Sequence, residues 1–509
     1  MEQPAVQTDR KPSRRFWLWL LAIHLIPTLL VAGFLYRIAY AKPTIAVDYS
    51  AKLTELQRTL QGMPADAFNA WDLISRRSAA VEQHQHTLLT TRFSGEYQYN
   101  DFLLLVDPTA RLSPAESRES VTAATRKTFA TYEAAGLFEG LEPLVDAKYA
   151  VATLAPGPQF ERVLPEVGQI RLVVRGNLVR MKAASDEQRF GDRAAILSQN
   201  LAIARHFTAQ PSWVERRAAA GWTMETLEEL RRQIIESPPP ADRCRALIAI
   251  IDAQTRSWPA TIQIEASRAS VLDIIQRSFT DNGRGGGRYL PYEYDFTSSN
   301  LGGFSAVSDN RHEGWRLKNL RGLLTPGRRE TVDLADQHFA HLYYLFGLQP
   351  PSSASPPSLT PPDPARVDAN PILSRGFLPR LDRLIAEEAG VRSEIAGTRL
   401  MLLLEIQRAS AGSYSAALSA VEVDHPGSTT DPANGKPFAY SLLENDPGGR
   451  GYLIYSLGAD GADDGGREDQ KDRRACYLPK QRTASDFILN HPRPPTPTAD
   501  AGESPESPQ

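Results

Sequence analysis

The residues best suited to chemistry lie in one acidic loop near the end of the chain. The stretch GYLIYSLGADGADDGG, residues 451 to 466, leads an apolar run directly into a turn rich in aspartate and glycine. Calcium prefers six to eight oxygen ligands, which a flexible loop of carboxylates and carbonyls supplies. Carboxylates held close together also repel one another unless a cation neutralises them. We therefore expect a calcium-type site here, with candidate ligands Asp460, Asp463, Asp464, Glu468 and Asp469.

Two other interpretations of this loop remain open. A solvated acidic turn requires no metal, because water can hydrate each carboxylate separately. In addition, basic residues are interleaved with the later carboxylates and could neutralise them directly. These basic residues are Arg467, Lys471, Arg473 and Arg474. The sequence therefore leaves open which of the carboxylates after Asp460 bind a metal.

Short elements upstream of the loop must position it. A helix is predicted to end near residues 412 to 414, and the DP and GKP steps of DPANGKPFAY indicate a turn. Residues 438 to 442 then read as a strand and residues 452 to 456 as its return strand. The DPGG sequence between them, at 446 to 449, is typical of a hairpin turn.

These elements resemble the globular domain of the major pseudopilin of type II secretion systems. The matching parts are the helix reaching a Gly-x-Tyr, DPxxGxPFxY at 431 to 440, YSLGADG at 455 to 461, and the acidic cluster that follows. The resemblance implies a small α+β module that binds calcium. Its ligands would be oxygens near Ser456 and Leu457, Asp460 and one or more later carboxylates. A pseudopilin's cleaved leader and membrane-helix glutamate are not apparent, so we do not expect a processed pilin subunit.

A second strong signal lies near the N-terminus. Residues 16 to 36 form a run of 21 residues without a formal charge, which as a helix would span ~31 Å, the thickness of a bilayer core. Basic residues are denser before this run than after it, so residues 1 to 15 are predicted to be cytoplasmic and the bulk of the chain extracytoplasmic, or periplasmic. A cleaved signal peptide is the alternative, because residues 39 to 41 read AYA. The length of the run favours an uncleaved anchor.

The remaining pattern predicts a mainly α protein. Residues 48 to 348 read as a helical domain that is repeat-like at 168 to 280, with helix ends at the prolines 238 to 240. Residues 349 to 364 form a Pro/Ser linker or a surface loop, and residues 365 to 490 a long helix plus the small module. Glycines 390 and 397 mark potential weak points of that helix. The tail, residues 491 to 509, is predicted to be disordered.

Composition and motifs narrow the function classes. A net charge of -3 argues against a nucleic-acid binder, and no HExxH or GxSxG motif indicates an enzyme. We expect a membrane-anchored extracytoplasmic protein that binds or scaffolds protein partners of the cell envelope. The layout as a whole resembles uncharacterised bacterial single-pass membrane proteins with a helical domain, which implies no activity. An envelope hydrolase with a site near residues 281 to 314, or an accessory subunit of a secretion-like complex, remains the alternative.

Overall fold

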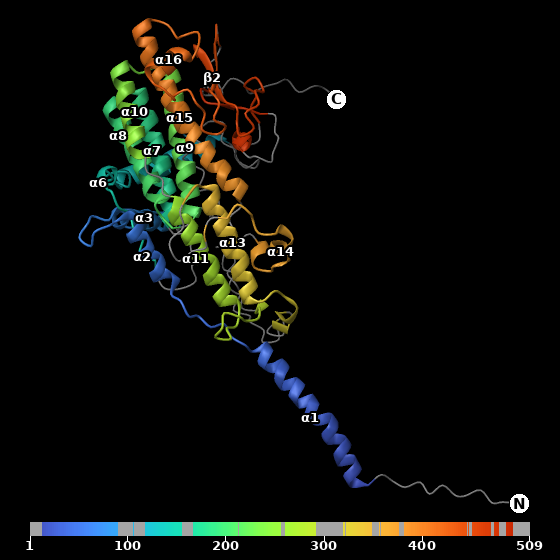
Figure 1. Cartoon of the computed structure of the whole chain (residues 1–509). Coiled ribbons are helices and arrows are strands. Elements are labelled where there is room, and N and C mark those ends of the chain that lie inside the picture. The colour runs from blue at the N-terminus through green and yellow to red at the C-terminus, as the bar shows by residue number, and fades with distance from the viewer. Residues whose placement is uncertain are drawn as a thin grey trace, which may run out of the picture.

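A computed structural model describes most of the chain (Figure 1). The described residues are 13–89, 105, 118–154, 166–211, 213–255, 260–291, 319–320, 322–348, 356, 358–375, 381–444, 446, 450–469, 473–477 and 485–491. The protein is mainly helical, as predicted, and has a small three-stranded sheet near its C-terminus. All of the predicted disordered tail except His491 lies outside the described residues.

The first helix, α1 (Arg14–Ala39), extends away from the rest of the molecule (Figure 1). Its segment Leu21–Ala39 has a mean hydropathy of 1.7 and is almost entirely exposed, so α1 is long and apolar enough to cross a membrane. Pro27 lies inside the helix. Among the side chains of α1 that the structure describes, only the last two, Ile38 and Ala39, are buried. The predicted apolar N-terminal helix is confirmed.

The repeat-like region folds into five helices, of which the first four pack together as an array. They are α7 (Glu166–Asp186), α8 (Phe190–Thr208), α9 (Trp213–Glu236), α10 (Ala241–Thr255) and α11 (Ala260–Ser278). Helix α9 ends just before the three prolines, as predicted, because proline lacks the N–H that the next helical hydrogen bond requires. Helix α8 contacts α7, α9 and α10 and so lies at the centre of the array.

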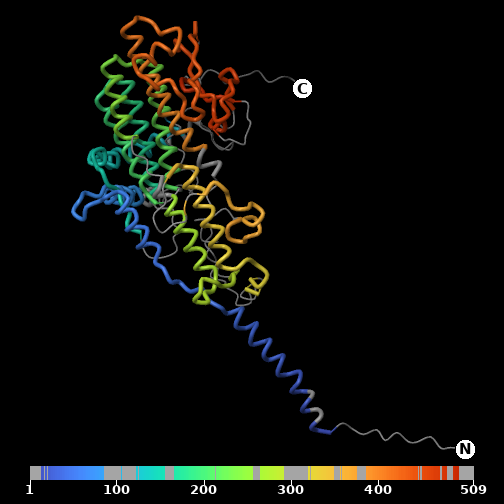
Figure 2. Tube along the Cα trace, in the orientation of Figure 1, coloured from blue at the N-terminus to red at the C-terminus, as the bar shows by residue number. Residues whose placement is uncertain are grey.

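The long helix α15 (Leu381–Ala411) packs between α9 and α10 although it follows them far along the chain (Figure 2). Its Leu400 and Leu404 share one apolar core with Leu230 of α9 and Leu247 of α10. The helix is continuous through both of its glycines, so the expected weak points do not break it. An added Cβ would lie 2.9 Å from Tyr477 at Gly390 and 2.4 Å from Leu489 at Gly397. These glycines instead allow the C-terminal module to approach closely.

A second group of helices lies between the array and α1. Helices α11 and α13 (Arg328–Leu345) pack together, and α2 (Tyr49–Gln61) packs on α11 (Figure 1). Asp48 caps α2 by accepting hydrogen bonds from the N–H groups of Ser50 and Ala51. The described part of the Pro/Ser segment lies on α13. The Ser358 N–H donates to the Ala340 carbonyl of α13, and the Ser358 carbonyl lies at hydrogen-bond distance from His341 Nδ1. The other helices of the body are α3 (Ala70–Leu89), α5 (Arg118–Ala134), α6 (Pro143–Asp146) and α14 (Pro364–Ala369).

The C-terminal module lies at the end of the body opposite α1 (Figure 1). Strands β1 (Ala439–Leu442) and β2 (Tyr452–Ser456) form the predicted antiparallel pair, with Ala439 opposite Tyr455. A third strand, β3 (Phe487–Ile488), adds to β2 and was not predicted, because two residues carry no periodicity. The short helix α16 (Ser419–Asp424) and the 3-10 helix η4 (Arg473–Tyr477) complete the module. Most of the predicted DPGG turn lies outside the described residues.

Candidate functional site

Asp431 fixes the start of the acidic loop. Its carboxylate is fully buried and accepts hydrogen bonds from the hydroxyl of Ser393 on α15 and, at 2.5 Å, from Ser456 Oγ at the end of β2. It also accepts the N–H of Ala433 at 3.0 Å and the amide of Asn434 at 3.2 Å. The aspartate of the DPxxGxPFxY motif therefore ties the turn, β2 and α15 together.

The first part of the loop is held by its own turn. Asp460 is exposed, and its Oδ1 accepts the N–H of Ala462 at 3.0 Å. The Nδ2 of Asn434 donates to the Gly458 carbonyl at 2.8 Å, and Lys436 Nζ donates to the Gly461 carbonyl at 2.7 Å. The Lys436 ammonium thus already places a positive charge at this end of the loop. The side chain of Leu457 is buried.

The next two aspartates lie close to a carboxylate that the sequence did not single out. Asp463 accepts the Tyr455 hydroxyl at 2.9 Å and the N–H of Gly465 at 2.8 Å. Asp486, which is fully buried just before β3, accepts the N–H groups of Asp464 at 3.1 Å and Gly466 at 2.8 Å. Asp486 escaped prediction because it lies outside the glycine-rich loop in the sequence and reaches it only through the pairing of β3 with β2.

Asp486 is a buried carboxylate in this region with one oxygen atom that lacks a compensating partner among the described residues. Its Oδ1 is buried and has no hydrogen-bond partner in the part of the chain that the structure describes. Burial and the nearby negative charges of Asp464 and Asp463 raise the pKa of Asp486 to about 6, although two backbone N–H groups oppose that rise. A cation close to Oδ1 would remove the electrostatic penalty.

The last two candidate metal ligands, Glu468 and Asp469, have different surroundings from the aspartates before them. Glu468 accepts Arg473 Nε at 3.0 and 3.1 Å and the N–H of Ile488 at 2.8 Å, so an arginine neutralises it directly. Asp469 is half-buried at the edge of the described loop. Within the described ranges, no three His, Cys, Asp or Glu side chains converge on a point that could hold a metal ion. Carbonyl and water oxygens would have to complete any calcium shell.

Arg473 and Arg474 of η4 also bind carboxylates of α15 and of the helical array. Arg474 Nε donates to Glu394 of α15 at 2.8 Å, and Arg231 of α9 donates to the other oxygen of Glu394 at 2.8 Å. Arg473 and Arg474 both donate to Glu228 of α9, at 2.7 and 3.2 Å. Burial alone would raise the pKa of Glu228, but Arg474 and Arg473 hold it well below its ordinary range. The sequence did not indicate these distant partners.

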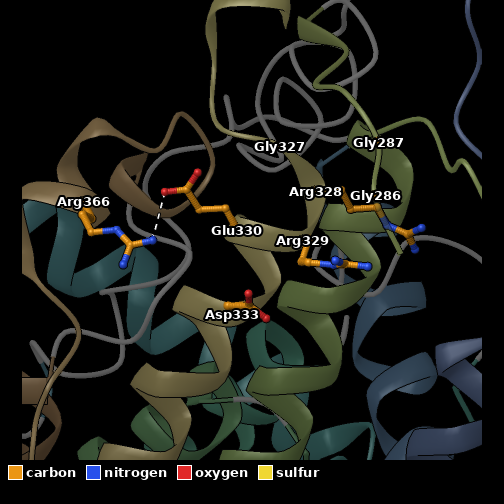
Figure 3. Close-up of a pocket in the computed structure, with 8 residues that line it drawn as sticks. All are labelled: Gly286, Gly287, Gly327, Arg328, Arg329, Glu330, Asp333 and Arg366. Atoms are coloured by element: carbon orange, nitrogen blue, oxygen red, sulfur yellow. Dashed lines mark hydrogen bonds and ion pairs between the residues drawn. The ribbon is translucent and has the colours of Figure 1, made fainter. Parts of the chain in front are cut away.

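A cavity next to the glycine-rich segment is lined by charged residues of both signs. It measures about 510 Å³ and lies between residues 286 to 287 and the start of α13. Arg366 donates to Glu330 at 3.0 Å, while Arg328 and Arg329 point away from that pair (Figure 3). Arg328 instead pairs with Asp281. Residues 292 to 314, the rest of the segment considered for a hydrolase site, lie outside the described residues.

Comparisons of the chain with protein-family models, curated proteins and solved structures found no match. The function therefore has to be argued from the geometry of the site itself.

The pairing around Glu394 leads to a stability prediction. The side chains of Arg231 and Glu394 are 2% and 0% exposed, and removing one partner of such a pair leaves a buried charge uncompensated, at a cost of about 3–5 kcal/mol. We expect Glu394→Gln to lower the free energy of unfolding by that amount in denaturant titrations. The matched control is Arg366→Gln, which breaks an exposed pair with side chains 50% and 44% exposed. It should change stability by less than about 1 kcal/mol. Equal effects of the two substitutions would contradict this account.

Proposed function

We propose that this chain is a membrane-anchored protein whose extracytoplasmic body binds or scaffolds protein partners of the cell envelope. The observation that carries the proposal is α1, an apolar helix whose length suits a membrane and whose described side chains are buried only at its end, at Ile38 and Ala39. The dense basic residues before it support a cytoplasmic N-terminus.

The junction between α1 and the body supports a fixed mounting of the body on the membrane. The Ala39 carbonyl accepts the amide of Asn319, which is itself buried, at 3.0 Å. A few residues later the backbone N–H groups of Ala46 and Val47 donate to Gln276 of α11, each at 3.2 Å, and Gln276 returns a hydrogen bond to Val47. These contacts hold the chain against the body at the end of α1 and again a few residues later.

The arrangement of the body favours binding over catalysis. Helical arrays offer broad, rigid surfaces for partners. Here the buried charges around Glu394 and Glu228 are used to join the array to the module, and Asp431 joins the module's own elements. The module, at the end opposite α1, is thereby presented on a stiff support (Figure 1).

Calcium is the proposed ligand of the acidic loop, with a structural role. The support is Asp486 with its unpaired buried oxygen beside Asp463 and Asp464, together with the resemblance of this module to a calcium-binding pseudopilin domain. Backbone oxygens near Leu457 and the exposed Asp460 are the other candidate ligands; Glu468 would first have to leave Arg473.

The anchor is tested by carbonate extraction of the full chain expressed in a bacterial host. The wild type should remain in the membrane, and protease added to spheroplasts should digest the body while an N-terminal tag stays protected. Leu25→Arg combined with Leu29→Arg should release the protein, since each arginine in a membrane span costs roughly 2.5–3.5 kcal/mol. The control, Leu359→Arg, alters an apolar residue of the body that is 70% exposed. Release of the wild type would refute anchoring, and a protease-resistant body would refute the orientation.

Partner binding is tested on the same membranes. Cross-linking before solubilisation should recover envelope proteins with the wild type and with Leu359→Arg. Recovery of the same proteins with a mock sample that lacks the chain would refute the scaffold proposal.

The calcium proposal is tested by thermal unfolding of the full chain in detergent. Millimolar calcium should raise Tm relative to chelator, because a ligand that binds only the folded state stabilises it. Asp486→Asn and Asp463→Asn should each reduce this rise by more than half. Asp424→Asn, which changes an exposed carboxylate on α16 of the same module, is the control and should leave it intact. The same Tm for the wild type in calcium and in chelator would refute the proposal.

A further inference from the structure

A cavity of about 210 Å³ lies where two helix–helix links of the array meet. One link joins α7 to α8 and the other, containing the three prolines, joins α9 to α10. The cavity is lined by Ala184, Ser185, Gln188, Phe190, Arg193, Ser237, Pro238, Pro239, Pro240 and Arg243. Its lining comes from the helical bundle and includes no residue of the acidic loop or of α1.

Arg193 lines this cavity as a buried cation with no counterion among the residues that the structure describes. The residue is only 6% exposed, and its Nε is buried without a hydrogen-bond partner. Its guanidinium lies 5.3 Å from the centre of the Phe190 ring, and that of Arg243 lies 5.0 Å from the same ring. Two positive charges therefore lie close to one aromatic ring.

The carboxylates at the end of α7 and the start of α8 do not compensate for the charge of Arg193. Glu187 and Asp192 both pair with Arg189, and Asp186 pairs with Lys182. Burial and then the charge of Arg243 lower the pKa of Arg193, and no carboxylate acts on it from the described residues. Because a buried charge without a partner is unfavourable, the site is electrostatically suited to an anion.

The backbone adds to the positive potential. Helices α8 and α10 both begin at this cavity, and Arg193 and Arg243 lie in their first turns. The first N–H groups of a helix have no partner within it, and the helix dipole is positive there, so such ends attract anions. Gln188, which also lines the cavity, is the one residue other than glycine with a positive φ among those described, at 56°.

We propose that this cavity binds the carboxylate or phosphate group of a small ligand between Arg193 and Arg243. A guanidinium presents paired N–H donors that match the oxygens of either group. Phe190 and the three prolines form an apolar wall for the rest of such a ligand. The proposal does not depend on the membrane anchor or on calcium.

The test is thermal unfolding of the full chain in detergent with chelator present. Inorganic phosphate and succinate are each compared with chloride at equal ionic strength. At about one hundred times the dissociation constant, the bound anion should raise Tm by about 3 °C. Arg193→Met should abolish this rise, and its Tm in chloride should equal or exceed that of the wild type, because the uncompensated charge is gone.

Two further variants keep the test decisive. Arg243 is exposed, so Arg243→Gln should fold normally and reduce the rise by more than half even if Arg193→Met does not fold. Arg392→Gln, which alters an arginine whose side chain is 63% exposed, should keep the full rise. A rise with either anion that disappears in the cavity variants supports the site and identifies the group it prefers. No rise beyond chloride with both anions, or a full rise in the cavity variants, would overturn the proposal.

Discussion

The interaction on which the rest of the structure depends is the buried ion pairing of Glu394. A carboxylate in a protein interior is unfavourable unless several donors compensate for it. Glu394 meets this requirement with Arg231 from α9 on one oxygen and Arg474 from η4 on the other. Because each arginine comes from a different part of the chain, the three elements can satisfy their charges only when they pack together.

This requirement makes α15 the common support of the array and the module. On one side its leucines fill the core between α9 and α10. On the other, Gly390 and Gly397 admit Tyr477 and Leu489 at distances that any Cβ would prevent. Ser393, next to Glu394, anchors Asp431 and through it the first turn of the acidic loop. The loop thus takes its position from a helix whose other face belongs to the bundle.

The sequence predicted what depends on local pattern and missed what depends on distant pairing. Neighbouring residues in the sequence predict the apolar run of α1, the end of α9 before the prolines and the β1–β2 hairpin. Asp486 is different, because only the pairing of β3 with β2 brings it to the loop. By contrast, the basic residues near the loop's carboxylates in sequence predicted a competition for those carboxylates. Arg473 does pair with Glu468. Nothing nearby could reveal that Arg474 binds Glu394.

The central claim, that the array and the module form one cooperative unit, can be measured with the protein's own thiols. Cys244 in α10 and Cys476 in η4 are both free and buried, one in each part. Labelling of the unmodified chain with a thiol reagent across a denaturant series, followed by peptide mass spectrometry, reports the opening of each part. The account predicts the same midpoint for both cysteines. Reaction of Cys476 at a clearly lower denaturant concentration than Cys244 would contradict it.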